Sequence, residues 1–320
     1  MILGEHLQEL HGLPAFTFPG PDEEPGAALP DAAAVAWRIA SDVYDSEEPW
    51  EAAFARFLGA VDTTRVRALI IGAWEEAYEN SSAEVIASLV AAKEQLPALR
   101  SLFLGDMGSE ECEISWIVQS DVAPLLDAFP ELEEFGVRGG TELAFSAVRH
   151  EKLRALTVQT GGLPATVVRG IAACRLPELR HLDLWLGDAQ YGGDAEVEDL
   201  DPFLVGAGFP RLEHLALRNS QFQDEIAASC ATAPVVPRLS VLDLSMGLLT
   251  DKGATALIEG QPLTHLSKLD LHYHYLSEEV KERIRETLQP SGVLLDLDEG
   301  GADSYEDDDG TVHRYVAVAE

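Results

Sequence analysis

The sequence has little cysteine and lacks long hydrophobic runs. Its three cysteines, Cys112, Cys174 and Cys230, lie far apart and form no CxxC pair. This excludes a secreted disulfide framework and predicts buried, reduced thiols in a cytoplasmic protein. No window holds the roughly 18 consecutive apolar residues of a membrane span, and the opening MILGEHLQELHGLPAF has no basic n-region. We therefore expect neither a membrane span nor a signal peptide.

Basic residues are also scarce. There are 22 Lys and Arg against 56 Asp and Glu, which gives a formal net charge of −34. Such a surface repels phosphate backbones and anionic membranes, so we expect no nucleic-acid or membrane partner. The excess acid fits plain solubility, and it also fits a basic protein or peptide partner. With 46% hydrophobic and 24% charged residues, the chain has the composition of a folded protein rather than a disordered one.

One phrase recurs along the chain: an apolar residue, two variable residues, an apolar residue, one variable residue and an apolar residue. The second and third apolar positions are two apart, so both lie on one face of a β-strand while the residue between them faces solvent. Successive copies start 21 to 33 residues apart. The copies are VRALII from Val66, LRSLFL from Leu99, LEEFGV from Leu132, LRALTV from Leu153, LRHLDL from Leu179, LEHLAL from Leu212, LSVLDL from Leu239 and LSKLDL from Leu266.

The segments between these phrases predict helices. In SSAEVIASLVAAKEQL, Ser81 and Glu84 have the spacing of a capping box. In MGLLTDKGATALIEGQ, Thr250 is the expected N-cap and Gly260 the expected end. Ser277 opens a further helix near the end of the chain. Parallel strands need crossover connections, and these helices supply them.

The run LSVLDLSMGLLTDKGATAL, residues 239–257, resembles the ribonuclease-inhibitor type of leucine-rich repeat. The resemblance implies an α/β fold: a leucine-rich-repeat solenoid with a curved parallel sheet on the concave side and helices on the convex side. One departure is that Ser220, Gly247 and His274 stand where the repeat expects Asn or Cys. The segments HLQELHGLP, AYENSSA, EISWIVQSDV and EEFGVRGGT also resemble an uncharacterised bacterial leucine-rich-repeat family. That resemblance implies an accessory role beside radical-SAM-type and ATP-grasp-type enzymes.

The expected organisation has three parts. Residues 1–65 form an N-terminal cap or irregular first repeat, with a strand around Trp37 and a helix that turns Trp50, Phe54 and Phe57 inward. Residues 66–297 form the repeats, and VLLDL near Val293 is a last partial strand. Residues 298–320 form an acidic loop whose final RYVAVAE could add one edge strand.

The solvent-facing strand positions would form the concave surface of such a solenoid. From residue 181 onward these positions are richer in aromatic, imidazole and carboxylate groups than the earlier ones. We expect the protein to be a non-enzymatic adaptor that binds a protein or peptide at this surface. The partner is basic if the acidic charge of the chain contributes to binding. We expect no cofactor and no metal. The predicted partner-binding residues are His181, Asp183, Trp185, His214, Arg218, Asp243, Asp270 and His272.

Two alternatives stay open. Asp183, His214, Asp243, Asp270 and His272 could approach one another as a metal or acid–base cluster, which would make the protein an enzyme. No HExxH, Walker loop, GxSxG or paired CxxC supports catalysis, however. The other alternative is a purely structural subunit of a larger assembly.

Two aromatic segments also allow different interpretations. The HYHY run that starts at His272 is either a binding hot spot or a pair of residues that packs against the last repeat. Trp116, in EISWIVQSDV, lies either on an exposed loop or in the core, and we expect it to be buried.

Overall fold

The computed structural model of the protein describes residues 5–21, 29–44, 48–302, 304–307 and 309–320. It is a mixed α/β structure with open, mostly parallel sheets. By its internal contacts the chain divides into two compact units, residues 1–159 with Glu320 (unit 1) and residues 160–319 (unit 2). No helix among the described residues is long and apolar enough to cross a bilayer.

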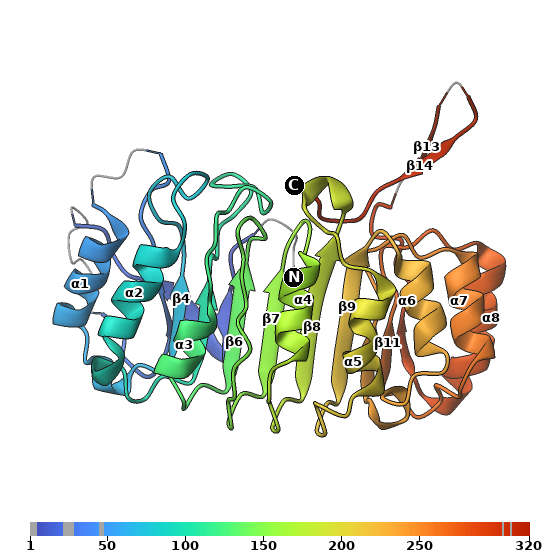
Figure 1. Ribbon diagram of the computed structural model, residues 1–320, viewed down its shortest axis with the longest axis horizontal. Coiled ribbons are helices and arrows are strands. Elements are labelled where there is room, and N and C mark those ends of the chain that lie inside the picture. Colours follow the sequence, from blue (N-terminus) through green and yellow to red (C-terminus); the bar gives the residue numbers. More distant parts are fainter. Residues whose placement is uncertain (1–4, 22–28, 45–47, 303, 308) are drawn as a thin grey trace. The chain divides into compact units, whose positions relative to one another are not determined.

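The sheet of unit 1 follows chain order. Strand β1 is antiparallel to β2, and β2 to β7 are parallel neighbours. Figure 1 shows helices α1 to α3 in front of this sheet. The strands are β1 Glu9–Leu10, β2 Leu13–Thr17, β3 Ala36–Ile39, β4 Ala68–Ile71, β5 Ser101–Leu104, β6 Glu134–Arg138 and β7 Ala155–Gln159; the helices are α1 Trp50–Ala60, α2 Ala83–Ala91 and α3 Ala123–Ala128.

Alternation along the strands of unit 1 divides their side chains between two faces. On the helix side, Trp37 of β3 packs on Phe57 of α1 with ring centroids 5.5 Å apart. Trp50, Phe54 and Phe57 are at most 3% exposed, so the prediction that they turn inward is confirmed. Burial of three large aromatic rings is the main stabilising contribution of this helix.

The other face of this sheet is covered by the chain's own N-terminal segment. Leu7 and Leu10 pack in one apolar cluster with Ala68, Ile70 and Phe103, which project from β4 and β5. The backbone N–H of Leu7 also donates to the side-chain carboxylate of Asp106, in the loop after β5. Beneath this segment the face is therefore part of the core, whereas Glu134 of β6 and Thr157 of β7 on the same face stay partly exposed.

In unit 2 the strands β8 to β12 are parallel neighbours in chain order. Their helices lie on one side of the sheet in Figure 1. The strands are β8 His181–Gly187, β9 His214–Ser220, β10 Val241–Asp243, β11 Lys268–Asp270 and β12 Leu294–Asp296; the helices are α4 Ala165–Ala172, α5 Asp201–Val205, α6 Gln223–Cys230, α7 Asp251–Glu259 and α8 Glu278–Leu288. All eight repeated phrases of the sequence thus coincide with strands, β4 to β11, and VLLDL forms β12.

Most of the expected helix ends are confirmed. The Thr250 hydroxyl accepts from the N–H of Lys252 at the start of α7, which ends before Gly260, and the Ser277 hydroxyl caps α8. The capping box at Ser81 is wrong, because α2 starts at residue 83 and no side chain caps it.

The end of the chain differs from the acidic loop that we expected. Strands β13 Ser304–Glu306 and β14 Val312–Arg314 form an antiparallel hairpin, which projects from unit 2 in Figure 1. Positions 303 and 308 of the expected loop lie outside the described residues. The segment after the hairpin, residues 315–319, is not a strand, so the predicted edge strand RYVAVAE is wrong.

Candidate functional site

The face of the unit 2 sheet opposite its helices carries polar side chains in rows that cross the strands. We call it the open face. Register places His181 of β8 beside His214 of β9, and Trp185 beside Arg218. Between these rows lies a row of acidic residues: Asp243 of β10 pairs with Asp270 of β11. The acidic row consists of Asp183, Asp243, Asp270 and Asp296, with Ala216 in the β9 position.

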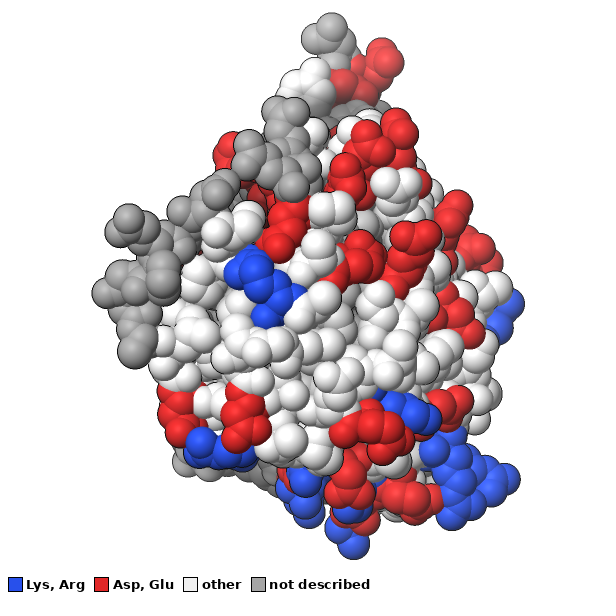
Figure 2. Space-filling view, turned by 90° about the vertical axis from the view of Figure 1, so that its left-hand side faces the viewer, with Lys and Arg blue, Asp and Glu red and all other residues white. Residues whose placement is uncertain are grey.

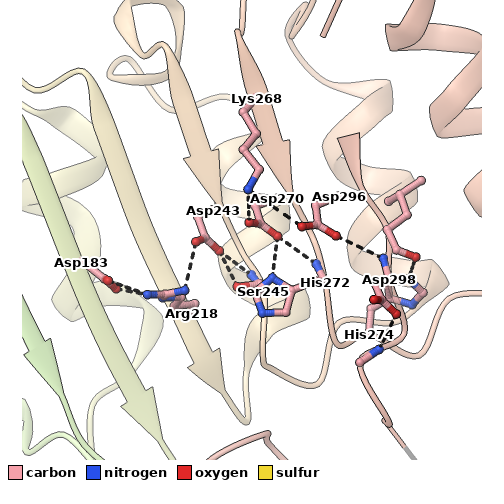
Figure 3. Close-up of polar contacts among 12 residues, drawn as sticks. Asp183, Arg218, Asp243, Ser245, Lys268, Asp270, His272, His274, Asp296 and Asp298 are labelled. Carbon is pink, nitrogen blue, oxygen red and sulfur yellow. Dashed lines mark hydrogen bonds and ion pairs between the residues drawn. The ribbon is translucent and has the colours of Figure 1, made fainter. Parts of the chain in front are cut away.

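Four aspartates on neighbouring strands repel one another unless counter-charges lie between them, because adjacent strands are only about 4.8 Å apart. Figure 3 shows how basic side chains from the flanking rows reach into the acidic row. Arg218 and Lys268 supply the two permanent positive charges. Four carboxylates and two cations, 4 − 2, leave an excess of two negative charges when the histidines are neutral.

Arg218 connects the two halves of the acidic row. Its Nε and Nη2 donate to the two carboxylate oxygens of Asp183 at 2.9 and 2.6 Å, a bidentate pair. Its Nη1 lies 3.3 Å from Asp243. The guanidinium also lies over the ring of Trp185, 5.2 Å from the ring centroid. Burial alone would lower the pKa of Arg218, but the charges of Asp183 and Asp243 outweigh it and raise the pKa.

Lys268 and His272 converge on Asp270. The ammonium of Lys268 lies 2.7 Å from Asp270 and 3.9 Å from Asp296. Nδ1 of His272 lies 2.7 Å from the other oxygen of Asp270. The hydrogen bond to Asp270 raises the pKa of His272. Burial would raise the pKa of Asp270, but the hydrogen bonds from His272 and Lys268 outweigh it and lower the pKa.

Asp243 has the opposite shift from its neighbour Asp270. Burial raises its pKa, and the nearby charges of Asp270 and Asp183 act in the same direction against the attraction of Arg218. Its Oδ1 accepts from the Ser245 hydroxyl at 2.5 Å. Neighbouring carboxyl groups whose pKa values are pushed apart are a recurrent feature of acid–base sites.

The imidazoles of His181 and His214 contact each other at one edge of the open face, with ring centroids 4.0 Å apart and an angle of 47° between their planes. Burial, followed by the proximity of His181, lowers the pKa of His214 to about 4. At neutral pH His214 is therefore an uncharged donor and acceptor on this face.

Asp270, His272 and Asp296 could also hold a metal ion. One ligand atom from each lies within 4.8 Å of the others. The ammonium of Lys268 already balances these carboxylates, so an added cation would have to displace it. Two carboxylates and an imidazole suit a divalent transition metal by ligand type, but the neighbouring lysine opposes one by charge.

A crystal structure of a protein from Bacteroides fragilis is similar to this chain with a TM-score of 0.73 and 29% sequence identity, over 77% of this chain and 70% of that one. The chain matches no protein-family model and none of the curated proteins compared with it. The long parallel sheet is compatible with a repeat protein.

The structure brings all eight predicted partner-binding residues onto the open face, but it corrects their exposure. Asp183, Trp185, Asp243 and Asp270 are each no more than 6% exposed, although these strand positions were expected to face solvent. One reason is that these side chains cover one another: the guanidinium of Arg218 lies over the ring of Trp185 and between the carboxylates of Asp183 and Asp243. The more exposed members of the face are His181, His214, Lys268, His272 and Asp296.

Asp296 was missed from the sequence, although a signal was present. VLLDL contains a fourth copy of the Leu-Asp-Leu triplet that also surrounds Asp183, Asp243 and Asp270. The acidic row could have been extended to β12 on that basis.

A charged cluster in unit 1 was missed as well. Asp106, whose side chain is fully buried, accepts from Arg38 Nε at 2.9 Å and lies 3.6 Å from Arg138 Nη1 and from His6 Nδ1. The one signal for it in the sequence was the arginine inside the otherwise apolar strand AVAWRIA. The cluster ties the N-terminal segment to β3 and β6, because the N–H of Leu7 also donates to Asp106.

The HYHY run is divided between packing and contact with the end of the chain. His274 is buried, with Nε2 lying 3.2 Å from the carbonyl of Leu297. The hydroxyls of Tyr273 and Tyr275 donate to the carbonyl of Tyr315 at 3.2 and 2.8 Å. Of the two histidines in this run, His272 is the one that points to the acidic row in Figure 3.

Residues 315–319, the C-terminal segment, continue across the loops that follow the strands of unit 2. The N–H of Ala317 donates to the carbonyl of Met246, and Asn219 exchanges two hydrogen bonds with the backbone of Val318, at 2.6 and 2.9 Å. A peptide-like stretch is thus held by hydrogen bonds along one rim of the unit.

Proposed function

We propose that the protein is a leucine-rich-repeat solenoid of the ribonuclease-inhibitor-like type. Eight copies of the repeated phrase lie on consecutive strands, and helices follow several of them, which supports a repeat built from strand, turn and helix. In this proposal the open face is part of the concave side of the solenoid. The open parallel sheet of each unit fits the same description.

We further propose that the protein is a non-enzymatic adaptor that binds a basic segment of a protein partner through the open face. The observation that carries this proposal is the acidic row, in which Arg218 and Lys268 leave two carboxylate charges uncompensated when Asp243 is ionised and His272 is neutral. Asp296 is 39% exposed at its side chain and ends the row, so a lysine or arginine of a partner can approach it. The cysteines Cys112, Cys174 and Cys230 are all buried, which suits the cytoplasm as the place of this interaction.

The arrangement is preorganised for such binding. Asp183, Arg218 and Asp243 hold one another, and so do Lys268, Asp270 and His272 (Figure 3). Side chains that are already fixed lose little conformational entropy when a partner arrives. Charge complementarity would contribute chiefly to the rate of association and to partner choice.

The test uses oligo-lysine and oligo-glutamate peptides of equal length with the whole protein. We compare the wild type with Asp296→Lys on the open face and with Glu279→Lys, a matched change at an exposed position of α8. Asp296→Lys should weaken oligo-lysine binding about tenfold, and Glu279→Lys should have little effect, because only the first change adds charge repulsion at the contact. Equal losses in both variants would show that net charge alone attracts the peptide and would overturn the assignment of the open face.

A metal-dependent or acid–base enzyme is the second candidate. It is favoured by the proximity of Asp270, His272 and Asp296 and by the opposed pKa shifts of Asp243 and Asp270. Equilibrium dialysis against Zn²⁺ and Mn²⁺ separates the candidates. Stoichiometric metal that is lost in Asp296→Asn and retained in Glu279→Gln would favour this function over the adaptor.

A further inference from the structure

A pocket of about 310 Å³ lies in unit 1 among three aromatic side chains. Tyr44, Tyr78 and Trp116 line it, together with Ser109, Cys112 and Glu113. Its volume is at the lower end of the roughly 300–1,000 Å³ that small-molecule sites occupy. None of the described residues that line it is basic.

The aromatic rings at this pocket are unusually exposed. Trp116 is 57% exposed, so the expectation that it is buried is wrong, and Tyr44 is 65% exposed. Tyr44 and Tyr78 stack with centroids 5.9 Å apart and an angle of 30° between their planes. Large apolar rings that face solvent at a pocket commonly mark a recognition site.

The pocket is built from the loops that follow three adjacent parallel strands, β3, β4 and β5. Backbone hydrogen bonds continue between these loops beyond the strands: the N–H of Glu76 donates to Val43, and that of Val118 to Ala77. The rings are therefore carried by loops with a hydrogen-bonded backbone, which reduces the entropy lost on binding.

The charges around the pocket are negative. Burial, and then the carboxylates of Glu76 and Glu79, raise the pKa of Tyr78. Burial, and then Glu113 and Glu111, raise the pKa of Cys112 to about 11, so its thiol stays protonated at neutral pH. Figure 2, which views this end of unit 1, shows mostly acidic charges in its upper part, whereas acidic and basic side chains are mixed in its lower part.

We propose that this pocket binds a trimethylammonium group, carried either by a small molecule such as choline or by a trimethylated lysine of a peptide. Aromatic faces attract such cations through their quadrupoles, and the methyl groups add apolar contact. The nearby carboxylate of Glu113 favours a cation over a neutral ligand of the same shape. The pocket belongs to unit 1 and is independent of the function proposed for the open face of unit 2.

The first test compares choline with 3,3-dimethyl-1-butanol, which has the same shape without the charge, by calorimetry on the full chain. Choline should bind at least about tenfold more tightly, which corresponds to roughly 1.4 kcal/mol. Equal binding of the two would show a merely hydrophobic pocket, and no binding of choline or of a trimethyl-lysine peptide would also overturn the proposal. Tighter binding of the trimethyl-lysine peptide than of choline would assign the group to a modified protein, and the reverse to a small molecule.

The second test locates the site. Trp116→Ala and Tyr44→Ala should each weaken choline binding about tenfold. Tyr305→Ala is the matched control, because Tyr305 is 59% exposed on the β13–β14 hairpin and does not line the pocket. Thermal unfolding of each variant checks that it is folded. Choline affinity that survives in folded Trp116→Ala and Tyr44→Ala would overturn the assignment to this pocket.

Discussion

Asp106 in unit 1 is a single carboxylate that balances two buried guanidinium groups. It has no exposed surface, and Arg38 and Arg138 are 8% and 6% exposed. Loss of one partner in a buried ion pair leaves an uncompensated charge in a poorly solvated site. The side chain also accepts from Leu7, so it fixes the N-terminal segment as well.

We therefore expect Asp106→Asn to destabilise the protein by about 3–5 kcal/mol. Urea unfolding followed by circular dichroism measures this. The matched control is Glu133→Gln, which removes the same charge from a partly exposed pair with Arg154 and should cost less than about 1 kcal/mol. Similar losses of unfolding free energy in both variants would mean that the buried cluster stabilises the protein no more than an exposed ion pair does.

The contribution of Asp106 to stability should be lost in acid. Burial raises its pKa, but the hydrogen bond from His6 and the charges of Arg38 and Arg138 outweigh this and lower it below 3.8. The stabilisation is therefore fully present above pH 3.8 and is lost as the pH falls through the lowered value.

The pKa values of His214 and His272 on the open face are shifted in opposite directions, so the two residues should have opposite effects on stability as the pH changes. The lowered pKa of His214, about 4, makes stability fall as the pH drops from 6.5 towards 4, since only the unfolded chain then binds the proton readily. The raised pKa of His272 favours the protonated fold, so its contribution is present below pH 6.5 and is lost as the pH rises through the folded value. NMR titration of the ring resonances checks both. A pKa of His214 near 6.5 would contradict the combined effect of partial burial and of the neighbouring His181.

The C-terminal segment packs closely against Gly161. A Cβ at Gly161 would lie only 2.0 Å from the carbonyl oxygen of Ala319, and its three nearest atoms all belong to that residue. Gly161→Ala should therefore displace the end of the segment while leaving the sheet in place.

Hydrogen exchange measures this displacement. In Gly161→Ala the amides of Ala317 and Val318, which donate to Met246 and Asn219, should exchange at least about tenfold faster, since an opening that costs 1.4 kcal/mol less is ten times more populated. Gly208→Ala is the control, because no atom lies within 4 Å of a Cβ at that position. Unchanged exchange in Gly161→Ala would show that the segment adjusts without leaving its place.

The strands could be predicted from the sequence because their signal is local. The two-residue spacing of apolar positions, as at Leu182 and Leu184, identified β4 to β12. The contacts that decide the faces are not local: Leu7 meets Asp106, and Asn219 meets Val318, each 99 positions apart. No pattern within a strand can show that such a distant segment covers it. The burial of the unit 1 face and the place of the C-terminal segment therefore emerge only from the structure.

The candidate site, too, could be predicted only in part: its face was predictable, and its burial was not. Side-chain alternation placed all eight partner-binding residues on one face, since this depends only on the two-residue period within each repeat. Their burial depends on which cation lies between which carboxylates. Arg218 of β9 contacts Asp183 on one neighbouring strand, β8, and Asp243 on the other, β10. Its position over Trp185 depends on the register between β8 and β9. Register between strands is set by packing along the whole sheet rather than by any one repeat.

For the whole molecule, the net charge of −34 opposes the compact state through self-repulsion. Salt screens this repulsion, with a Debye length that falls from about 30 Å at 0.01 M to about 3 Å at 1 M. The unfolding midpoint should therefore rise by a few degrees from low to high NaCl. The same screening should weaken binding of oligo-lysine to the open face, because that attraction is electrostatic.

Scanning calorimetry and peptide titration over one NaCl series test both effects on the same sample, with KCl at matched ionic strength to separate screening from a specific effect of sodium. If the midpoint fell with salt, the ion pairs of the fold would outweigh its self-repulsion. If stability rose but peptide affinity stayed constant, the peptide would be held by apolar contacts, and the acidic row would not be what attracts it. Opposite responses of stability and affinity are expected because one set of carboxylates acts on both: it repels itself within the chain and attracts a basic partner from outside.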